Sequence, residues 1–105
     1  MSGNATALKD KIALVTGASS GIGRSTALGL AVQGASLRLV GRDPARLGAV
    51  ASIIMDNGGD AKTYEADLSL DEDLHLLAER IKSDSKHVDI LVHSAGAFSM
   101  GPIVP

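Results

Sequence analysis

The chain has 105 residues, of which 45% are hydrophobic and 21% are charged, and its formal net charge is −2. This length suits one domain with one core, and the composition excludes a disordered chain. The small net charge gives no electrostatic footprint for nucleic acid or an anionic membrane, and because the sequence contains no cysteine, disulfides and sulfur-ligated zinc are excluded.

The first third of the chain predicts a strand, a helix and a second strand. Residues 12–15 form a continuous apolar run, which is typical of a strand covered on both faces. Residues 21–33 carry a helical pattern that ends at Gly34. The residues expected to face the sheet from this helix are Ile22, Ala27, Leu30 and Ala31. The second strand is predicted at residues 37–40.

A second helix is predicted to begin at Asp43 and Pro44, because aspartate is a favoured N-cap and proline suits the first helical position. Its apolar residues recur at helical spacing and are expected to be buried: Leu47, Val50, Ala51 and Ile54. The glycines of the segment 57–59 end it. The strand expected next, residues 63–66, alternates in polarity and therefore suits an edge of the sheet.

The last predicted elements are a third helix and a fourth strand. Ser69 and Glu72 form a possible capping box for the helix. Its expected buried stripe is Leu70, Leu74, Leu77, Ala78 and Ile81. Residues 88–92 form an apolar strand that implies neighbours on both sides. The order βαβαβαβ predicts a parallel sheet with crossover helices in one α/β domain over residues 1–105, with a flexible start at 1–10 and an irregular tail at 97–105.

A glycine-rich segment, Thr16-Gly-Ala-Ser-Ser-Gly-Ile-Gly23, lies between the first strand and the first helix. Gly17 permits a tight turn, Gly21 lets the backbone approach a pyrophosphate, and Gly23 allows close packing of the helix on the strand. The open N-terminus of the helix attracts phosphate. A P-loop is excluded because Arg24 follows the last glycine. The segment therefore predicts a dinucleotide site, with a plain connecting turn as the alternative.

This segment resembles the T-G-x-x-x-G-x-G motif of the short-chain dehydrogenase/reductase family. Asp67 and Leu68 match the place where the family binds the adenine ring through a carboxylate and the next backbone N–H, although Asp67 also suits a helix start. The segment 93–96 resembles the family's N-N-A-G segment with both asparagines replaced. Its first residue, His93, is assigned no chemistry, because a histidine at a strand end is more often packed and hydrogen-bonded than catalytic.

The resemblance implies an incomplete NAD(P)-binding domain of Rossmann type, a doubly wound parallel sheet with strand order 3-2-1-4. It covers almost all of this chain but less than half of a typical family member. The cofactor-binding residues that it implies, together with Arg42, are Gly17, Ser19, Ser20, Gly21, Ile22, Gly23, Arg42, Asp67, Leu68, Ala95 and Gly96.

The end of the second strand indicates which dinucleotide is bound. In dinucleotide folds an acidic residue there binds the ribose hydroxyls and favours NAD. Gly41 stands at this position, and the next residue, Arg42, can donate to a 2′-phosphate. We therefore expect NADP rather than NAD, although an arginine beside Asp43 can also be a solvated surface residue.

The family's catalytic groups have no counterpart in the sequence. Its Tyr-x-x-x-Lys pair is absent, because Leu68 stands four residues after Tyr64, the one tyrosine. The three histidines are scattered, so neither a catalytic residue nor a metal site is assigned. For the chain alone we expect little or no turnover and weak or absent NADP binding, because the nicotinamide side of the cleft is missing.

The resemblance implies the cofactor half of an NADP-dependent oxidoreductase that acts on a carbonyl or an alcohol. We expect the parent protein to be cytoplasmic and homo-oligomeric, with no nucleic acid or membrane partner. Two alternatives remain open: a non-catalytic module that binds a dinucleotide or a partner subunit, and a non-functional fragment.

Overall fold

A computed structural model of the chain describes residues 7–19, 21–85 and 87–93. Strands and helices alternate along these residues: β1 (Ile12–Thr16), α1 (Gly21–Val32), β2 (Ser36–Gly41), α2 (Pro44–Asp56), β3 (Asp60–Glu65), α3 (Asp71–Asp84) and β4 (Ile90–His93). The strands are parallel and their order is β3-β2-β1-β4. The predicted fold class and strand order are therefore confirmed. The predicted irregular tail lies outside the described residues.

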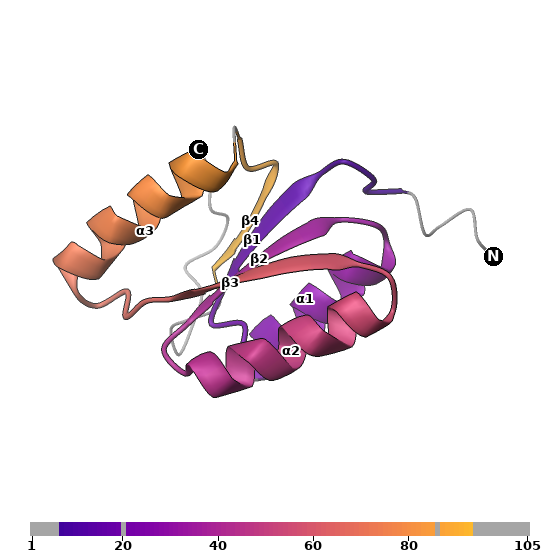
Figure 1. Cartoon of the computed structure of the whole chain (residues 1–105), viewed down its shortest axis with the longest axis horizontal. Coiled ribbons are helices and arrows are strands. Elements are labelled where there is room, and N and C mark those ends of the chain that lie inside the picture. Colours follow the sequence, from indigo (N-terminus) through magenta and orange to yellow (C-terminus); the bar gives the residue numbers. More distant parts are fainter. Residues whose placement is uncertain (1–6, 20, 86, 94–105) are drawn as a thin grey trace.

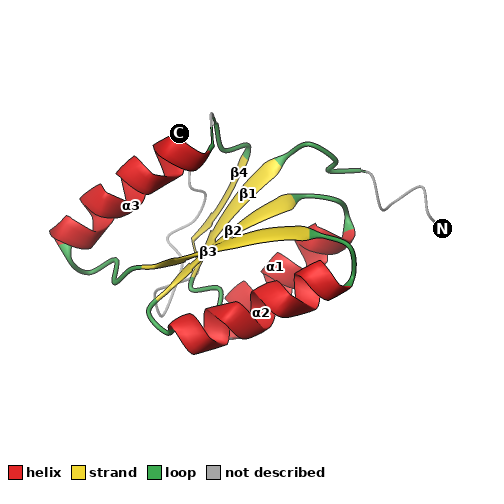
Figure 2. Ribbon diagram, in the orientation of Figure 1, coloured by secondary structure: helices red, strands yellow, loops and turns green. Residues whose placement is uncertain are grey.

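The helices cover both faces of the sheet (Figure 1). α1 and α2 lie side by side on one face, and α3 lies alone on the other (Figure 2). Alternation along β2 matches these layers, since Leu37 and Leu39 belong to the core under α1 and α2, whereas Val40 belongs to a smaller cluster under α3. No helix in the described part of the chain is long and apolar enough to cross a bilayer.

α2 has the structure that its sequence predicts. The side chain of Asp43 caps it, because Oδ1 accepts hydrogen bonds from the N–H groups of Ala45 at 3.1 Å and Arg46 at 3.2 Å. The predicted apolar residues are all buried: Leu47, Val50, Ala51 and Ile54. The helix ends before Gly58, whose φ of 88° lies in the region that favours glycine.

The sheet-facing side of α1 differs from the prediction at one residue. Ala27 is buried and Leu30 and Ala31 pack against the core, as expected. The prediction for Ile22 is wrong, because this side chain is 78% exposed. The buried residue in the first turn is Gly23. It lies four positions before Ala27, so the sheet-facing stripe passes through Gly23 and leaves Ile22 to one side.

The capping box predicted for α3 is not formed. The N-cap residue is Leu70, and no side chain caps the helix. The Ser69 hydroxyl instead donates to Asp67 Oδ1 at 2.6 Å. Asp67 accepts from the backbone N–H of Ser69 as well, which is the local turn that aspartate commonly forms. The serine is therefore engaged before the helix begins.

The predicted buried stripe of α3 is also largely wrong. Leu77 is buried and Ile81 is half-buried, but Leu70 is 52% exposed and Leu74 44% exposed. Ala78 is exposed too. Because α3 is the one described helix on its face of the sheet (Figure 2), it buries only the narrow line of side chains that points straight at the strands. Residues on either side of that line would need neighbouring elements to cover them.

The outer strands of the sheet are β3 and β4. β3 is an edge strand as predicted, and it begins three residues earlier than its expected start at residue 63. The apolar sequence of β4 predicts two neighbours, but within the described residues it pairs with β1 alone. Leu91 is accordingly 43% exposed. In the described part of the chain β4 is therefore an edge strand with an apolar surface.

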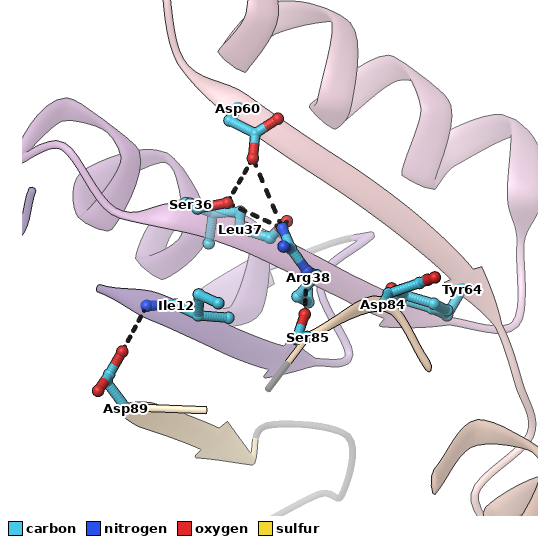
Figure 3. A network of polar contacts seen from close by, with 9 residues as sticks. All are labelled: Ile12, Ser36, Leu37, Arg38, Asp60, Tyr64, Asp84, Ser85 and Asp89. Atoms are coloured by element: carbon cyan, nitrogen blue, oxygen red, sulfur yellow. Dashed lines mark hydrogen bonds and ion pairs between the residues drawn. The ribbon is translucent and has the colours of Figure 1, made fainter. Parts of the chain in front are cut away.

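A buried arginine links β2 to the end of α3, which the sequence analysis did not identify. Arg38 is only 6% exposed, and its Nε donates to Ser85 Oγ at 3.1 Å. Its terminal nitrogen Nη1 donates to Ser36 Oγ at 2.8 Å and to the Leu37 carbonyl at 3.2 Å. Nη1 also lies 3.6 Å from Asp60 Oδ2 (Figure 3). These partners compensate for removing the charge from water.

A second polar contact holds the same end of α3. The hydroxyl of Tyr64, on β3, donates to Asp84 Oδ2 at 2.6 Å (Figure 3). Burial, together with this hydrogen bond to a carboxylate, raises the pKa of Tyr64 to about 12. The Arg80 guanidinium lies 5.1 Å from the centre of the tyrosine ring, within the range of a cation–π contact. The C-terminal half of α3 is therefore attached to the sheet by side chains from two strands.

Candidate functional site

The glycine-rich segment forms a turn that leads from β1 into α1. Gly17 and Gly21 have φ angles of 66° and 59°, in the left-handed region that favours glycine. The N–H of Ala18 donates to the Val40 carbonyl at 3.1 Å, which ties the turn to the end of β2. A Cβ placed on Gly21 would meet no atom within 4 Å. Since α1 starts there, its first N–H groups have no partner within the helix.

A cavity of about 830 Å³ lies beside this turn, at the carboxyl ends of β2 and β3. This is the edge at which ligands bind in open parallel sheets, and the volume is in the range of small-molecule sites. Five of the predicted cofactor-binding residues line it: Gly17, Ser19, Arg42, Asp67 and Leu68. The fold thus gathers residues from three separate loops around one space.

The other predicted site residues lie elsewhere. Gly21, Ile22 and Gly23 form the start of α1 and are not part of the cavity wall. Ser20, Ala95 and Gly96 lie outside the described residues. The structure therefore brings together the predicted adenosine side of the site.

The carboxylate of Asp67 is held in place by its neighbours. Oδ1 accepts hydrogen bonds from the Ser69 hydroxyl at 2.6 Å and the Ser69 N–H at 3.0 Å. These two bonds hold the pKa of Asp67 below its ordinary value, and the nearby Arg42 guanidinium acts in the same direction. The N–H of Asp67 donates to Asp73 Oδ2 at 2.7 Å. Asp67 is thus an oriented, ionised acceptor at the cavity wall.

Gly41 is buried at the end of β2 and lines the same cavity. A Cβ at this position would lie 3.2 Å from Leu47 Cδ2 and 3.5 Å from Ser19 Oγ. The Gly41 carbonyl accepts from the Ala66 N–H at 2.9 Å, which joins the ends of β2 and β3. Close packing against Leu47 is therefore a structural reason for glycine at this position.

Two arginines line the cavity on the side of α2. Arg42 is exposed, and within the described residues it forms no ion pair. Arg46, which the sequence analysis missed, lies on the first turn of α2, and its Nε is 3.4 Å from Asp43 Oδ2. The sequence did contain an indication that Arg46 is near the site. Arg46 stands three residues after the predicted N-cap Asp43, on a helix that begins at the predicted binding edge of the sheet.

His93 lies at the carboxyl end of β4, in register with Thr16 of β1. Its Nδ1 is 3.0 Å from Thr16 Oγ1, and that hydroxyl also lies 3.4 Å from the Val92 carbonyl. This contact joins the ends of the two strands directly before the glycine turn. The sequence-based prediction that His93 is hydrogen-bonded agrees with this contact.

Comparison with known proteins gives a family match. Residues 11–104 match the family model described as short chain dehydrogenase. Among curated proteins, an uncharacterised oxidoreductase of Staphylococcus saprophyticus is 48% identical over 90 residues, which is 85% of this chain and 38% of that protein. The chain thus spans about two fifths of the length of this relative.

Solved structures show the same likeness. A short chain dehydrogenase from Shigella flexneri, complexed with NADP, superposes with a TM-score of 0.82 at 39% identity, over 88% of this chain and 40% of that one. A metagenomic short-chain oxidoreductase, also in complex with NADP, gives a TM-score of 0.78 at 35% identity, over 81% of this chain and 38% of that one.

Proposed function

The chain belongs to the short-chain dehydrogenase family and corresponds to its N-terminal, cofactor-binding portion, and on that premise we propose that it binds NADP as part of an oxidoreductase. The bound cofactor would supply or accept a hydride at a carbonyl or alcohol carbon. The residues of this chain hold the cofactor's pyrophosphate and adenosine.

The glycine turn suits the pyrophosphate. The backbone at Gly17 and Gly21 adopts angles that side chains disfavour, and the space beside Gly21 is open. The first N–H groups of α1 and the positive end of its dipole attract an anion there. The N–H of Ala18 is already bonded to Val40 and takes no part.

The cavity beside the turn suits the adenosine. Asp67 presents an ionised carboxylate that is held in place by Ser69, and an exocyclic amino group of adenine can donate to it. The backbone N–H of Leu68 corresponds to the family's donor to the adenine ring, and Leu68 lines the same cavity.

Arg42 is the observation that carries the preference for NADP over NAD. It borders the cavity beside Gly41, where a carboxylate would repel a 2′-phosphate, and no carboxylate of the described residues pairs with it. Its guanidinium can therefore form charge-assisted hydrogen bonds to the phosphate. Two similar structures, each solved with NADP, support this proposal.

A non-catalytic dinucleotide-binding module is the second candidate. It is favoured by the lack of a Tyr-x-x-x-Lys pair in these 105 residues. The coding sequence downstream of codon 105 separates the two candidates, because a serine and a Tyr-x-x-x-Lys pair there would establish the enzyme and a stop codon would favour the module. Turnover by this chain would require an acid other than that pair, whereas binding without turnover agrees with both the module and the cofactor part of an enzyme.

The test of NADP binding is a titration of the ¹⁵N-labelled chain with NADP and with NAD, followed by amide chemical shifts. Binding to these 105 residues is expected to be weak, but NADP should bind more tightly than NAD and shift the amides of Gly17, Arg42 and Leu68. Arg42→Ala should weaken NADP binding by about 1.5 to 3 kcal/mol, the range for hydrogen bonds to a charged group, and NAD binding much less. An equal loss for both cofactors would remove Arg42 from the phosphate site.

A further inference from the structure

The cavity contains a second cation besides Arg42. We propose that Arg46 is a second ligand of the 2′-phosphate of a bound nucleotide and so helps to determine the preference for NADP. This inference rests on the proposed NADP binding and assigns Arg46 a role in it. Arg46 lines the same cavity as Arg42 and Gly41, from the first turn of α2.

The charges around the cavity call for more than one cation. A phosphate monoester carries a charge of about −1.5 to −2 near neutral pH, and Arg42 supplies one positive charge. Two carboxylates also line the cavity, those of Asp43 and Asp67. Without Arg46, the charged side chains of the wall would sum to −1 before any phosphate arrived. With Arg46 they sum to zero, so its charge offsets a repulsion that Arg42 alone leaves in place.

Backbone N–H groups of α2 cannot take this part. The start of a helix often binds phosphate through its free N–H groups. Here the N–H groups of Ala45 and Arg46 both donate to Asp43 Oδ1, and residue 44 is proline, which has no N–H. The start of α2 therefore offers a phosphate no free N–H group, and any contact from this helix must come from a side chain.

The guanidinium of Arg46 is anchored on one side and can turn toward a ligand on the other. Its Nε lies 3.4 Å from Asp43 Oδ2, which anchors one side of the guanidinium. Its two terminal nitrogens form no hydrogen bond or ion pair within the described residues. These two nitrogens form the fork that suits a phosphate. The side chain is 67% exposed, so a small rotation toward a ligand disturbs little packing.

Two nucleotides that occupy only the adenosine half of the site provide the test. Adenosine 2′,5′-bisphosphate carries the 2′-phosphate, and 5′-AMP lacks it. The whole chain and four variants, Arg46→Gln, Arg46→Lys, Arg42→Gln and Lys82→Gln, would be titrated with each by amide shifts. Lys82 is an exposed cation in the last turn of α3, away from the cavity, and controls for the loss of one positive charge.

Arg46→Gln should weaken the bisphosphate by about two- to fivefold, as expected for an exposed ion pair, and leave 5′-AMP unchanged. Arg46→Lys keeps the charge but loses the fork, so it should retain only part of the affinity, and Lys82→Gln should alter neither nucleotide. If Arg46→Gln behaved like Lys82→Gln while Arg42→Gln lost the preference, the inference would be wrong and the NADP proposal would stand. If the unaltered chain failed to prefer the bisphosphate, both would fail. An equal loss for the two nucleotides in Arg46→Gln would indicate a structural role and also overturn the inference.

Discussion

Replacing Gly41 with aspartate should reverse the cofactor preference. Gly41 ends β2 within the cavity, so a carboxylate there stands where dinucleotide folds that use NAD place their acidic residue. Such a carboxylate accepts hydrogen bonds from the ribose hydroxyls of NAD and repels the 2′-phosphate of NADP. The variant thus changes both affinities in opposite directions.

The size of this change follows from the charges. At a separation of about 6 Å and an effective dielectric constant of about 40, two unit charges repel by about 1.4 kcal/mol. A phosphate charge of about −1.5 to −2 then weakens NADP binding by about 2 to 3 kcal/mol. A hydrogen bond from ribose to the carboxylate adds about 1.5 kcal/mol for NAD. The ratio of the two dissociation constants should therefore change by more than about a hundredfold.

Packing sets the cost to stability and determines the control. The new Cβ would lie 3.2 Å from Leu47 Cδ2, so this flexible side chain must move by a few tenths of an ångström. We expect a loss of about 1 kcal/mol in the free energy of unfolding. Gly41→Ala introduces the same Cβ without the charge, so it should show this loss and keep the preference for NADP.

Titration of both variants with NADP and NAD, with urea unfolding of each, is the measurement. If Gly41→Asp and Gly41→Ala lost NADP affinity by the same factor, the glycine would be present for packing against Leu47 alone. The electrostatic argument for the preference would then be refuted.

Two further predictions concern the attachment of α3. Arg38→Met keeps the apolar stem but removes the bonds to Ser85 and to the start of β2, so unfolding by urea should show a loss of about 1.5 to 3 kcal/mol. Asp60→Asn, at an exposed partner, should cost less than about 1 kcal/mol. Because the folded pKa of Tyr64 is raised from 10.0 to about 12, its contribution is complete below pH 10 and is lost as the pH rises toward 12. Thermal unfolding should therefore show an alkaline decline that Tyr64→Phe reduces, and an identical decline in both proteins would contradict this assignment.

The sequence predicted most reliably what local chemistry controls. The N-cap at Asp43 and the apolar stripe of α2 were correct because a capping side chain and helical spacing act within a few residues. The capping box predicted at Ser69 is not formed although its spacing is right, because the Ser69 hydroxyl donates to Asp67, two residues earlier, instead. The prediction that Ile22 faces the sheet was wrong because contact with the sheet sets the rotation of α1 about its axis, and this contact places Gly23 inward.

The order of strands and helices, the parallel sheet and the glycine turn were determined by the sequence alone, because hydrophobic periodicity and glycine act on the chain locally. Only the tertiary structure decided that Arg46 joins Arg42 at one cavity and that Arg38 is buried against Ser85. It also decided that one helix leaves Leu70 and Leu74 exposed. These features depend on how elements distant in sequence are placed side by side. That placement cannot be predicted from the spacing of residues along the chain.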